Sequence, residues 1–527
     1  MYFSHNSPKA KLWAFFIGSC IALSAETTAP NFVLVYIDDL GWADTSVEMI
    51  KGRENTRSDF YQTPHLQRLA DEGMVFSDAY APAPVCTPSR NSMLHGMTPA
   101  RLLNATLDTS RSKAEYRGEI TIPQAVKRAN PSYITAHFGK WHIGSIRPDV
   151  AGYDVTENIK GTGNGEGDYM DDMKTHLPEK DPKRIFSLTK MSKEFIAEQV
   201  QAERPFFLQL SHYSVHIWHD SLLETREKYR ALERPSKAVD SDYLSEDLIP
   251  DFKHNWLLNY AAMVDDTDRA FGDLLDHIDN LGIADNTYII FTSDNGGGLR
   301  GNAPLRGAKA DLTEGGIRVP FIVRGPNILP GSYCSLPIAG WDLLPTFYEL
   351  AGGKKDLPST LDGASLAKVF EKGATTKINR PNNALIFHFP WYNGEPESAI
   401  RRDDFKLLKN LDSGQTWLYN IKEDYAEKYD LSDMEPELLA TLDNDLNEYL
   451  HSVEAENVNE LRLVFLNNIE NSWMDNAHKR ADRYREDAQS GDISAQEELF
   501  KAEKYISWLE EQIIFTRERM SLSKSSK

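Results

Sequence analysis

The chain has 527 residues, of which 41% are hydrophobic and 10% aromatic, so it is long enough for two domains and too apolar to be disordered. Its formal charge of −21 argues against a nucleic-acid partner, because a phosphate binder normally presents a basic face. Any attraction for an anionic substrate must therefore come from a local cluster of basic side chains and metal that works against the overall charge.

The N-terminus has the features of an export signal. Lys9 and Lys11 precede an apolar run over 12–23 that ends in small residues. This run is too short to span a membrane, so residues 1–25 are predicted to be a cleaved signal peptide and the protein to be periplasmic or secreted. A lipid-anchored outer-membrane form through Cys20 stays open as an alternative. No later segment is apolar enough to cross a bilayer.

The first carboxylate pair follows the first predicted strand. Residues 31–37 (NFVLVYI) predict a buried strand, and Asp38 and Asp39 come directly after it, before Leu40-Gly41. Paired carboxylates at the end of a strand repel each other unless a cation holds them. Asp and Gly also favour turns, so these residues alone are compatible with either a metal site or a simple turn.

The run Cys86-Thr87-Pro88-Ser89-Arg90 predicts a nucleophile at a helix entrance. Pro88 suits the first helical turn, and the N-terminal amides of the helix would favour negative charge beside position 86. Arg90 would return to the same side and add a fixed cation with a planar donor fork. This segment is therefore suited to binding an oxyanion.

Two further segments follow predicted strands. After residues 132–138 comes Lys140, and in extended chain His142 would point to the same face. Next to a metal and an anion such a lysine stays charged, while the histidine can shuttle a proton near neutral pH. Three histidines follow the strand predicted at 205–210: His212, His216 and His219.

A second oxygen-rich pair ends the strand predicted at 287–292. Asp294 and Asn295 stand there before three glycines, which let the backbone bend closely around a site. Together with Asp38 and Asp39 they form an all-oxygen set, which suits Ca²⁺ or Mg²⁺ and differs from a zinc site. Both pairs are expected at the carboxyl ends of strands, where α/β sheets form their sites, and this favours a metal.

Strands alternate with helical periods up to about Gly353, as in the amphipathic stretch 260–281. This alternation predicts an α/β fold over 26–383, with a large mixed, mostly parallel sheet flanked by helices.

The rest of the chain reads differently. A connector at 354–381 leads to short strands and a helix over 384–452, which predict a smaller C-terminal antiparallel α+β subdomain. The charged tail 453–527 predicts a helical extension that packs back on the body or mediates association. Short strands are expected at 384–392, 399–409 and 416–420.

Several of these segments resemble type I sulfatases, the formylglycine-dependent enzymes of the alkaline phosphatase superfamily. Residues 86–90 resemble the signature C-x-P-S-R, and 138–144 (FGKWHIG) resemble the second signature. In the segment 302–320, Lys309 occupies the position of a lysine that reaches the sulfate in that family, although Ala308 replaces the usual second glycine. The matches run in the family's order from about Asn31 to Pro320, which implies the alkaline-phosphatase-like fold.

The match at His216 departs from the family, which usually has proline before this histidine. Val215 stands there instead, and Ile217-Trp218-His219 follow where another proline is common. His212 and His219 therefore remain competitors for the role of His216.

The resemblance implies that Cys86 is oxidised to formylglycine (3-oxoalanine) by a formylglycine-generating enzyme, and that the hydrated aldehyde attacks sulfur. It implies one Ca²⁺ with five ligands: Asp38, Asp39, Cys86, Asp294 and Asn295. Three basic residues would compensate charge on the sulfate oxygens: Arg90, Lys140 and Lys309. His216 would protonate the leaving alcohol, and His142 would take the remaining hydroxyl proton as sulfate leaves.

The resemblance to exported bacterial polysaccharide sulfatases implies a sulfated carbohydrate substrate, in particular an algal cell-wall polysaccharide of the ulvan or sulfated galactan type. Four side chains are candidates for the mouth of the site: His212, Trp218, His219 and Arg306. A phosphonate or phosphodiester hydrolase of the same superfamily is the alternative within enzymes. A non-catalytic binder of sulfated glycans is a more remote alternative.

Overall fold

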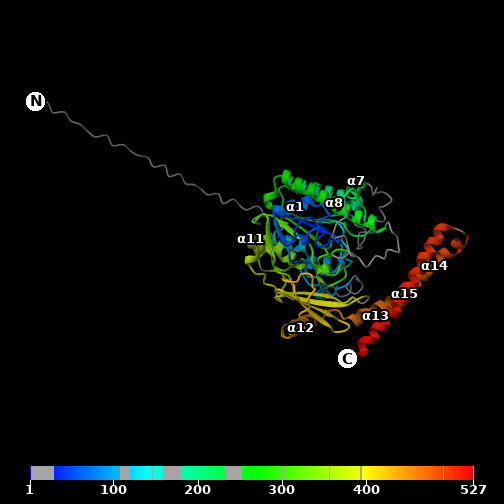
Figure 1. Ribbon diagram of the computed structural model, residues 1–527. Coiled ribbons are helices and arrows are strands. Elements are labelled where there is room, and N and C mark those ends of the chain that lie inside the picture. Colours follow the sequence, from blue (N-terminus) through cyan, green and yellow to red (C-terminus); the bar gives the residue numbers. More distant parts are fainter. Residues whose placement is uncertain are drawn as a thin grey trace.

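The computed structural model describes, besides Met1, residues 29–106, 119–144, 146–157, 180–217, 219–232, 252–298, 302–354, 356–391, 394–490 and 492–525. Apart from Met1, the predicted signal peptide lies outside these residues. The described chain forms a large sheet between two layers of helices, a smaller sheet below it, and a helical hairpin that stands off the body (Figure 1). The predicted fold class is thereby confirmed.

The large sheet has eight strands in the order β5-β4-β6-β1-β7-β8-β2-β9. Its central strands β4, β6, β1 and β7 are parallel, whereas β8 runs antiparallel to both of its neighbours. All carboxyl ends of the four parallel strands therefore meet at one edge. The strands are β1 (Asn31–Ile37), β2 (Met74–Phe76), β4 (Ile134–Gly139), β5 (Val155–Thr156), β6 (Phe206–Ser211), β7 (Thr287–Ser293), β8 (Phe321–Arg324) and β9 (Ser332–Cys334).

Helices cover both faces of this sheet, because side chains along a strand alternate between its faces. Along β1, Phe32 and Leu34 belong to a core with α4 (Ile122–Ala129) and α10 (Leu343–Leu350). Val33 belongs to the opposite core. That core is completed by α1 (Pro64–Asp71), α6 (Ile185–Gln201) and α8 (Phe252–Asn280).

The smaller unit is a four-stranded antiparallel sheet in chain order, with α12 (Pro436–Ser452) packed on it. Its strands are β11 (Leu385–Phe389), β12 (Glu397–Arg402), β13 (Phe405–Asn410) and β14 (Thr416–Asn420). The single strand expected at 399–409 is wrong. Asp403 has a φ of 50° and makes a turn with Asp404, so the segment folds back as a hairpin.

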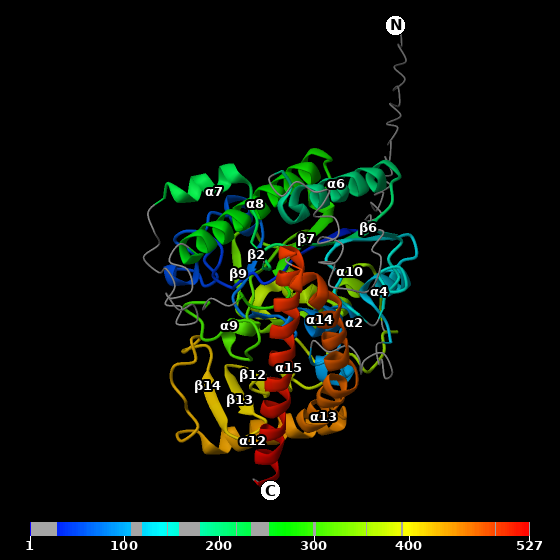
Figure 2. The same ribbon diagram turned by 90° about the vertical axis from the view of Figure 1, so that its right-hand side faces the viewer.

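The chain continues into α13 (Val458–Asn468), a π-helical turn at Ile469–Trp473, α14 (Met474–Gln489) and α15 (Ile493–Ser525). Helices α14 and α15 form the hairpin, and Figure 2 shows it in front of the body. Arg462 and Arg519 anchor its base through ion pairs to Asp412. Among the described residues no helix has the length and apolarity that a membrane span requires.

The remaining helices and short strands connect these layers. They are β3 (Ala79–Tyr80), β10 (Ile338–Ala339), α2 (Cys86–His95), α3 (Pro99–Leu102), α7 (Leu223–Arg230), α9 (Glu314–Ile317) and α11 (Ala367–Lys372).

Candidate active site

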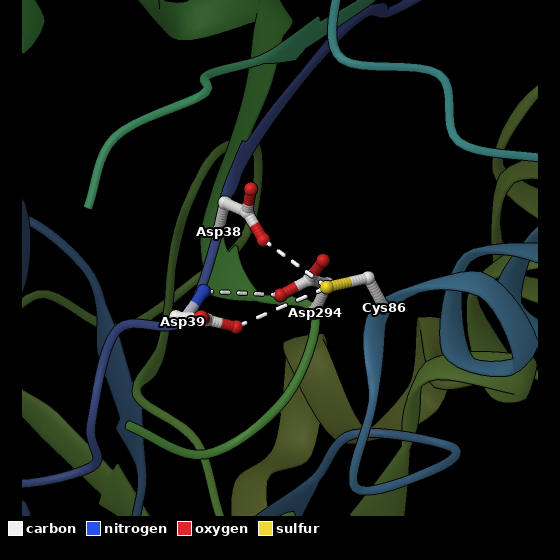
Figure 3. A group of neighbouring side chains, drawn as sticks. All are labelled: Asp38, Asp39, Cys86 and Asp294. Carbon is white, nitrogen blue, oxygen red and sulfur yellow. Dashed lines mark hydrogen bonds between the residues drawn. The ribbon is translucent and has the colours of Figure 1, made fainter. Parts of the chain in front are cut away.

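The two carboxylate pairs lie side by side at the carboxyl edge of the parallel strands. The register pairs Ile37 with Ser293, so the residues that follow these two strands emerge together. The Asp294 N–H donates to the Ile37 carbonyl at 3.0 Å, and the Asp39 N–H donates to Oδ1 of Asp294 at 3.2 Å. Asp38, Asp39 and Asp294 converge there on one point with Cys86 (Figure 3).

Cys86 is the first residue of α2, after Val85 in extended conformation, and Pro88 stands in the first turn as predicted. Its Sγ lies 3.4 Å from Oδ1 of Asp38 and 3.9 Å from Oδ1 of Asp39. The side chain is buried, and burial raises the pKa of the thiol well above its usual range, with Asp294 adding to the effect. The unmodified thiol is therefore a poor nucleophile here.

The carboxylate cluster fits a hard cation. One ligand atom from each of four residues, Asp38, Asp39, Cys86 and Asp294, lies within 4.8 Å of the others, and all four residues are buried. Asn295 is completely buried too, and its Oδ1 has no hydrogen-bond partner among the described residues. An orphaned amide oxygen beside three carboxylates is the donor set that Ca²⁺ or Mg²⁺ prefers.

Three basic side chains surround the same point. Lys140, directly after β4, places its Nζ 2.5 Å from Oδ2 of Asp38 and 3.7 Å from the Sγ of Cys86. The Nζ of Lys309 lies 2.8 Å from Asp39 and 3.4 Å from the same sulfur.

Arg90, one turn into α2, is held on both sides. Its Nε donates to Oδ2 of Asp294 at 2.7 Å, and its Nη1 donates to the Lys140 carbonyl at 2.9 Å. Its Nη2 is buried without a hydrogen-bond partner in the described structure. The arginine thus keeps one donor for a bound oxyanion.

The charges at the site are strongly coupled. Burial alone would raise the pKa of Asp38, but Lys140, His216 and Arg90 hold it well below its usual range. Burial raises the pKa of Asp294, and the neighbouring Asp38 adds to this effect against the pull of Arg90. Fixed cations next to fixed anions create a field that is prepared before any ligand arrives.

The two histidines assigned to proton transfer lie at this site. His142 adopts a φ of 52°, and burial, with Lys140 and Arg90 adding, lowers its pKa to about 2. His216 bonds through Nδ1 to the Ile217 carbonyl at 2.6 Å, and its Nε2 lies 3.8 Å from Oδ2 of Asp39. His216 is thus in contact with a predicted metal ligand.

The three expected mouth residues that the structure describes lie in different surroundings. His212 is fully buried just after β6, where its backbone N–H donates to the Tyr36 carbonyl at 2.9 Å, so its ring does not line an open mouth. Arg306 turns toward the smaller unit, where Nη1 donates to the Tyr419 hydroxyl at 2.7 Å. His219 packs edge-on against Tyr260, with ring centres 5.2 Å apart. Trp218 lies outside the described residues.

Asn302 is a site residue to which the sequence analysis gave no role. Its buried Nδ2 donates to the carbonyls of Gly297 at 3.3 Å, Gly307 at 3.4 Å and Gly315 at 2.6 Å. It thereby ties the loop after Asn295 to the loop before Lys309. It stands at the start of the segment that carries Lys309, but nothing in one sequence indicates which loops its amide would join.

The comparisons with known proteins agree with this geometry. The Sulfatase family model matches residues 30–353, so the chain belongs to the sulfatase family. A sulfatase of Formosa agariphila is 27% identical over 76% of this chain and 84% of its own length, and an ulvan-active sulfatase of the same organism is 26% identical over 82% of both chains. The solved structure of Ps i-CgsB in complex with k-i-k-neocarrahexaose is 26% identical, with a TM-score of 0.63 over 80% of this chain and 93% of that one. The protein is accordingly a sulfuric ester hydrolase.

Proposed function

We propose that this protein removes sulfate from a sulfated algal polysaccharide or its oligosaccharides, of the ulvan or sulfated galactan type, through a formylglycine formed from Cys86 and a bound Ca²⁺. The observation that carries the proposal is the convergence of Cys86, three carboxylates and three fixed cations at one buried point. The ulvan-active relative and the neighbour solved with a neocarrahexaose support the class of substrate.

Five residues would hold the cation and the modified side chain: Asp38, Asp39, Cys86, Asp294 and Asn295. The Ca²⁺ would screen the sulfate charge, and the hydrated formylglycine would supply the hydroxyl that attacks sulfur. The sulfate oxygens would be bound by the ammonium groups of Lys140 and Lys309 and by Nη2 of Arg90. These donors are already fixed by ion pairs, so binding needs little reorganisation.

Proton transfers fall to the two histidines. The bond from Nδ1 of His216 to the Ile217 carbonyl orients the ring so that Nε2 faces the site, where it would protonate the leaving alcohol. A sugar alkoxide is a poor leaving group, so this acid matters more for a glycan than for an activated aryl ester. His142 would take the remaining hydroxyl proton as sulfate departs.

The proposal includes the cellular setting. A formylglycine-generating enzyme is the required maturation partner, and the export signal at 1–25 would place the enzyme in the periplasm or outside the cell, with lipid anchoring through Cys20 as the other route.

The test is sulfate release from ulvan, carrageenans and their oligosaccharides, measured by ion chromatography after coexpression with a formylglycine-generating enzyme. We expect release by the wild type and by Cys334→Ala, a matched control at the other described free cysteine, and none by Cys86→Ala. Mass spectrometry of the peptide that contains residue 86 measures the modification.

Phosphodiester and phosphonate esters belong in the same panel. If formylglycine is present and only these esters are hydrolysed, the protein is a phosphoryl-ester hydrolase and the proposed substrate is wrong. Glycan binding without turnover by the modified protein would instead favour the non-catalytic alternative.

A further inference from the structure

Helix α15 is apolar on two opposite faces. One face is buried at residues spaced seven apart, namely Ala495, Ala502, Leu509 and Thr516. Leu509 of this face lies in one apolar cluster with Phe465 of α13 and Ala477 of α14. Across from them lie the buried alanines of α14. Small residues at this contact let the two helices approach closely, and this seam accounts for the cohesion of the hairpin.

The second apolar face is exposed. Ile493, Phe500 and Ile514 are 73%, 58% and 60% exposed, and their spacing of seven and fourteen residues keeps them on one side of the helix. Phe500 precedes Ala502 by two residues, about 200° around the helix, so this stripe points away from α14. A helix that is apolar on opposite faces is normally buried on both.

Exposure of this kind is concentrated in the extension. Of the fifteen large hydrophobic side chains that are exposed in the described structure, six lie between residues 463 and 514. The hairpin stands off the body in Figure 1, and the three side chains of the stripe are exposed, so nothing within the described chain covers them. About a fifth of this chain lies outside the match to the solved neighbour named above, which is itself matched over 93% of its length.

The distribution of charge along α15 indicates which kind of molecule covers its exposed apolar face. Residues 493–511 contain five Glu and two Lys, whereas 512–525 contain three basic residues and one Glu. The acidic half, on a chain of net charge −21, disfavours a sulfated glycan, a nucleic acid or an anionic membrane. A second α15 running antiparallel about Ser507 would place residues 493–502, which carry two Glu and one Lys, against residues 512–521, which carry two Arg and one Glu, and would place Lys504 opposite the second copy's Glu510. A parallel α15 would oppose like charges along its whole length.

We propose that this chain forms a homodimer in which the stripe Ile493, Phe500 and Ile514 of α15 pairs antiparallel with the same stripe of a second copy. The contact is isologous, since one surface meets itself across a two-fold axis. Phe500 then packs near the partner's Ile514. Ser507 is exposed midway between positions 500 and 514 and lies close to the axis. This arrangement covers the outer face of α15 as α14 covers the inner one.

The first test is the mass of the full mature chain by sedimentation equilibrium over a roughly fifty-fold range of concentration. We expect twice the mass of one chain. The double variant Phe500→Glu/Ile514→Glu should raise the dimer Kd by on the order of 100-fold or more, because two carboxylates would enter the desolvated centre of the interface twice. Leu329→Glu/Met434→Glu, at two exposed apolar residues of the body, is the matched control and should remain dimeric.

The second test distinguishes this interface from any other. Ser507→Cys should form a disulfide-linked dimer under mild oxidation, because the two engineered thiols meet at the axis and the native Cys86 and Cys334 are buried. Asp482→Cys, exposed on α14, should stay monomeric on the same non-reducing gel. A monomeric wild type at every concentration, a dimer that the double glutamate variant leaves intact, or no crosslink at 507 would each overturn the proposal. Circular dichroism checks that the variants keep their helices.

Discussion

The active site and the junction between the large sheet and the C-terminal subdomain each gather three acidic and three basic side chains. At the active site these are Asp38, Asp39, Asp294, Arg90, Lys140 and Lys309. The junction cluster consists of Asp78, Glu314, Glu427, Arg318, Arg401 and Lys406. Composition is therefore the same in both, and every carboxylate in each cluster is paired with a base, so the difference between them lies in the polar atoms around the charges.

In the junction cluster every carboxylate meets a base. Lys406 lies 2.9 Å from both Glu314 and Glu427, and Asp78 is paired with Arg318 and Arg401. At the active site, Oδ1 of Asn295, Nη2 of Arg90 and Nδ1 of His142 are buried without hydrogen-bond partners in the described part of the chain. In the junction cluster only Oε1 of Glu427 lacks a hydrogen bond among the described residues, and it lies 2.9 Å from the ammonium group of Lys406. We call the junction cluster closed, because its charges hold the large sheet and the C-terminal subdomain together. We call the active-site cluster open, because its remaining polar atoms find partners only when ligands bind.

The largest expected effect on stability comes from breaking the closed cluster. Lys406→Met leaves Glu314 and Glu427 buried without their cation, which should lower the free energy of unfolding by about 3–5 kcal/mol. Urea denaturation followed by tryptophan fluorescence measures this. Lys422→Met, which removes an exposed pair with Asp404, is the control and should cost less than about 1 kcal/mol. A loss below 1 kcal/mol in Lys406→Met would mean that the cluster does not stabilise the junction.

Removing a lysine from the open cluster at the active site should lower activity and leave stability almost unchanged. Lys309→Ala removes a donor beside Cys86 that is partly exposed, so we expect kcat/KM for the glycan to fall by about 100- to 1000-fold with little change in the urea midpoint. Lys409→Ala, which breaks the pair with Asp443 on the subdomain, serves as the matched control and should keep full activity. Retention of activity within tenfold in Lys309→Ala would remove this lysine from the sulfate-binding group.

The difference between the two clusters also decided what the sequence could predict. Asp38, Asp294 and Lys140 each follow directly after a β-rich run, and parallel strands bring such positions to one edge, so the open cluster was predictable from strand ends. The junction cluster was not, because Asp78 and Arg318 are 240 residues apart and ordinary residue types at ordinary spacings carry no signal.

Two smaller features escaped prediction for local reasons. The turn at Asp403 is set by one residue in a left-handed conformation within an otherwise strand-like run. His212 is buried at the edge of the sheet, where its N–H donates to the Tyr36 carbonyl of a neighbouring strand, and periodicity within one strand cannot show this neighbour.

A carboxyl group at the edge of the junction cluster should make stability depend on pH. Burial raises the pKa of Glu397 to about 7, although its bond from the Leu312 N–H opposes the shift. The folded chain therefore binds a proton that the unfolded chain releases above about pH 4.5, so this group favours folding less as pH rises from about 4.5 to 7. Glu397→Gln should stabilise the protein by about 3 kcal/mol at pH 8 and by almost nothing at pH 4.5.

Denaturation of wild type and Glu397→Gln in parallel across this range measures the effect. Glu423→Gln, at an exposed carboxylate of the same subdomain, should show no pH-dependent difference. An equal gain at both pH values would attribute the effect of Glu397→Gln to packing rather than to proton binding.

The smallest expected effect concerns the residue that positions the open cluster. Asn302→Ala removes the donors to the carbonyls of Gly297, Gly307 and Gly315, which should lower the free energy of unfolding by about 1–3 kcal/mol. Since Gly297 follows Asn295 by two residues and Gly307 precedes Lys309 by two, the loops that carry both site residues loosen together. We expect kcat to fall by about tenfold with KM nearly unchanged, because orientation at the reacting centre is lost while the donors themselves remain.

Asn55→Ala, which removes an exposed bond to the Tyr425 hydroxyl, is the control and should leave both constants unchanged. If Asn302→Ala lost stability but kept its kcat, Asn302 would have a structural role only and would not position the active site. The open cluster would then keep its geometry through the ion pairs of Arg90, Lys140 and Lys309 alone.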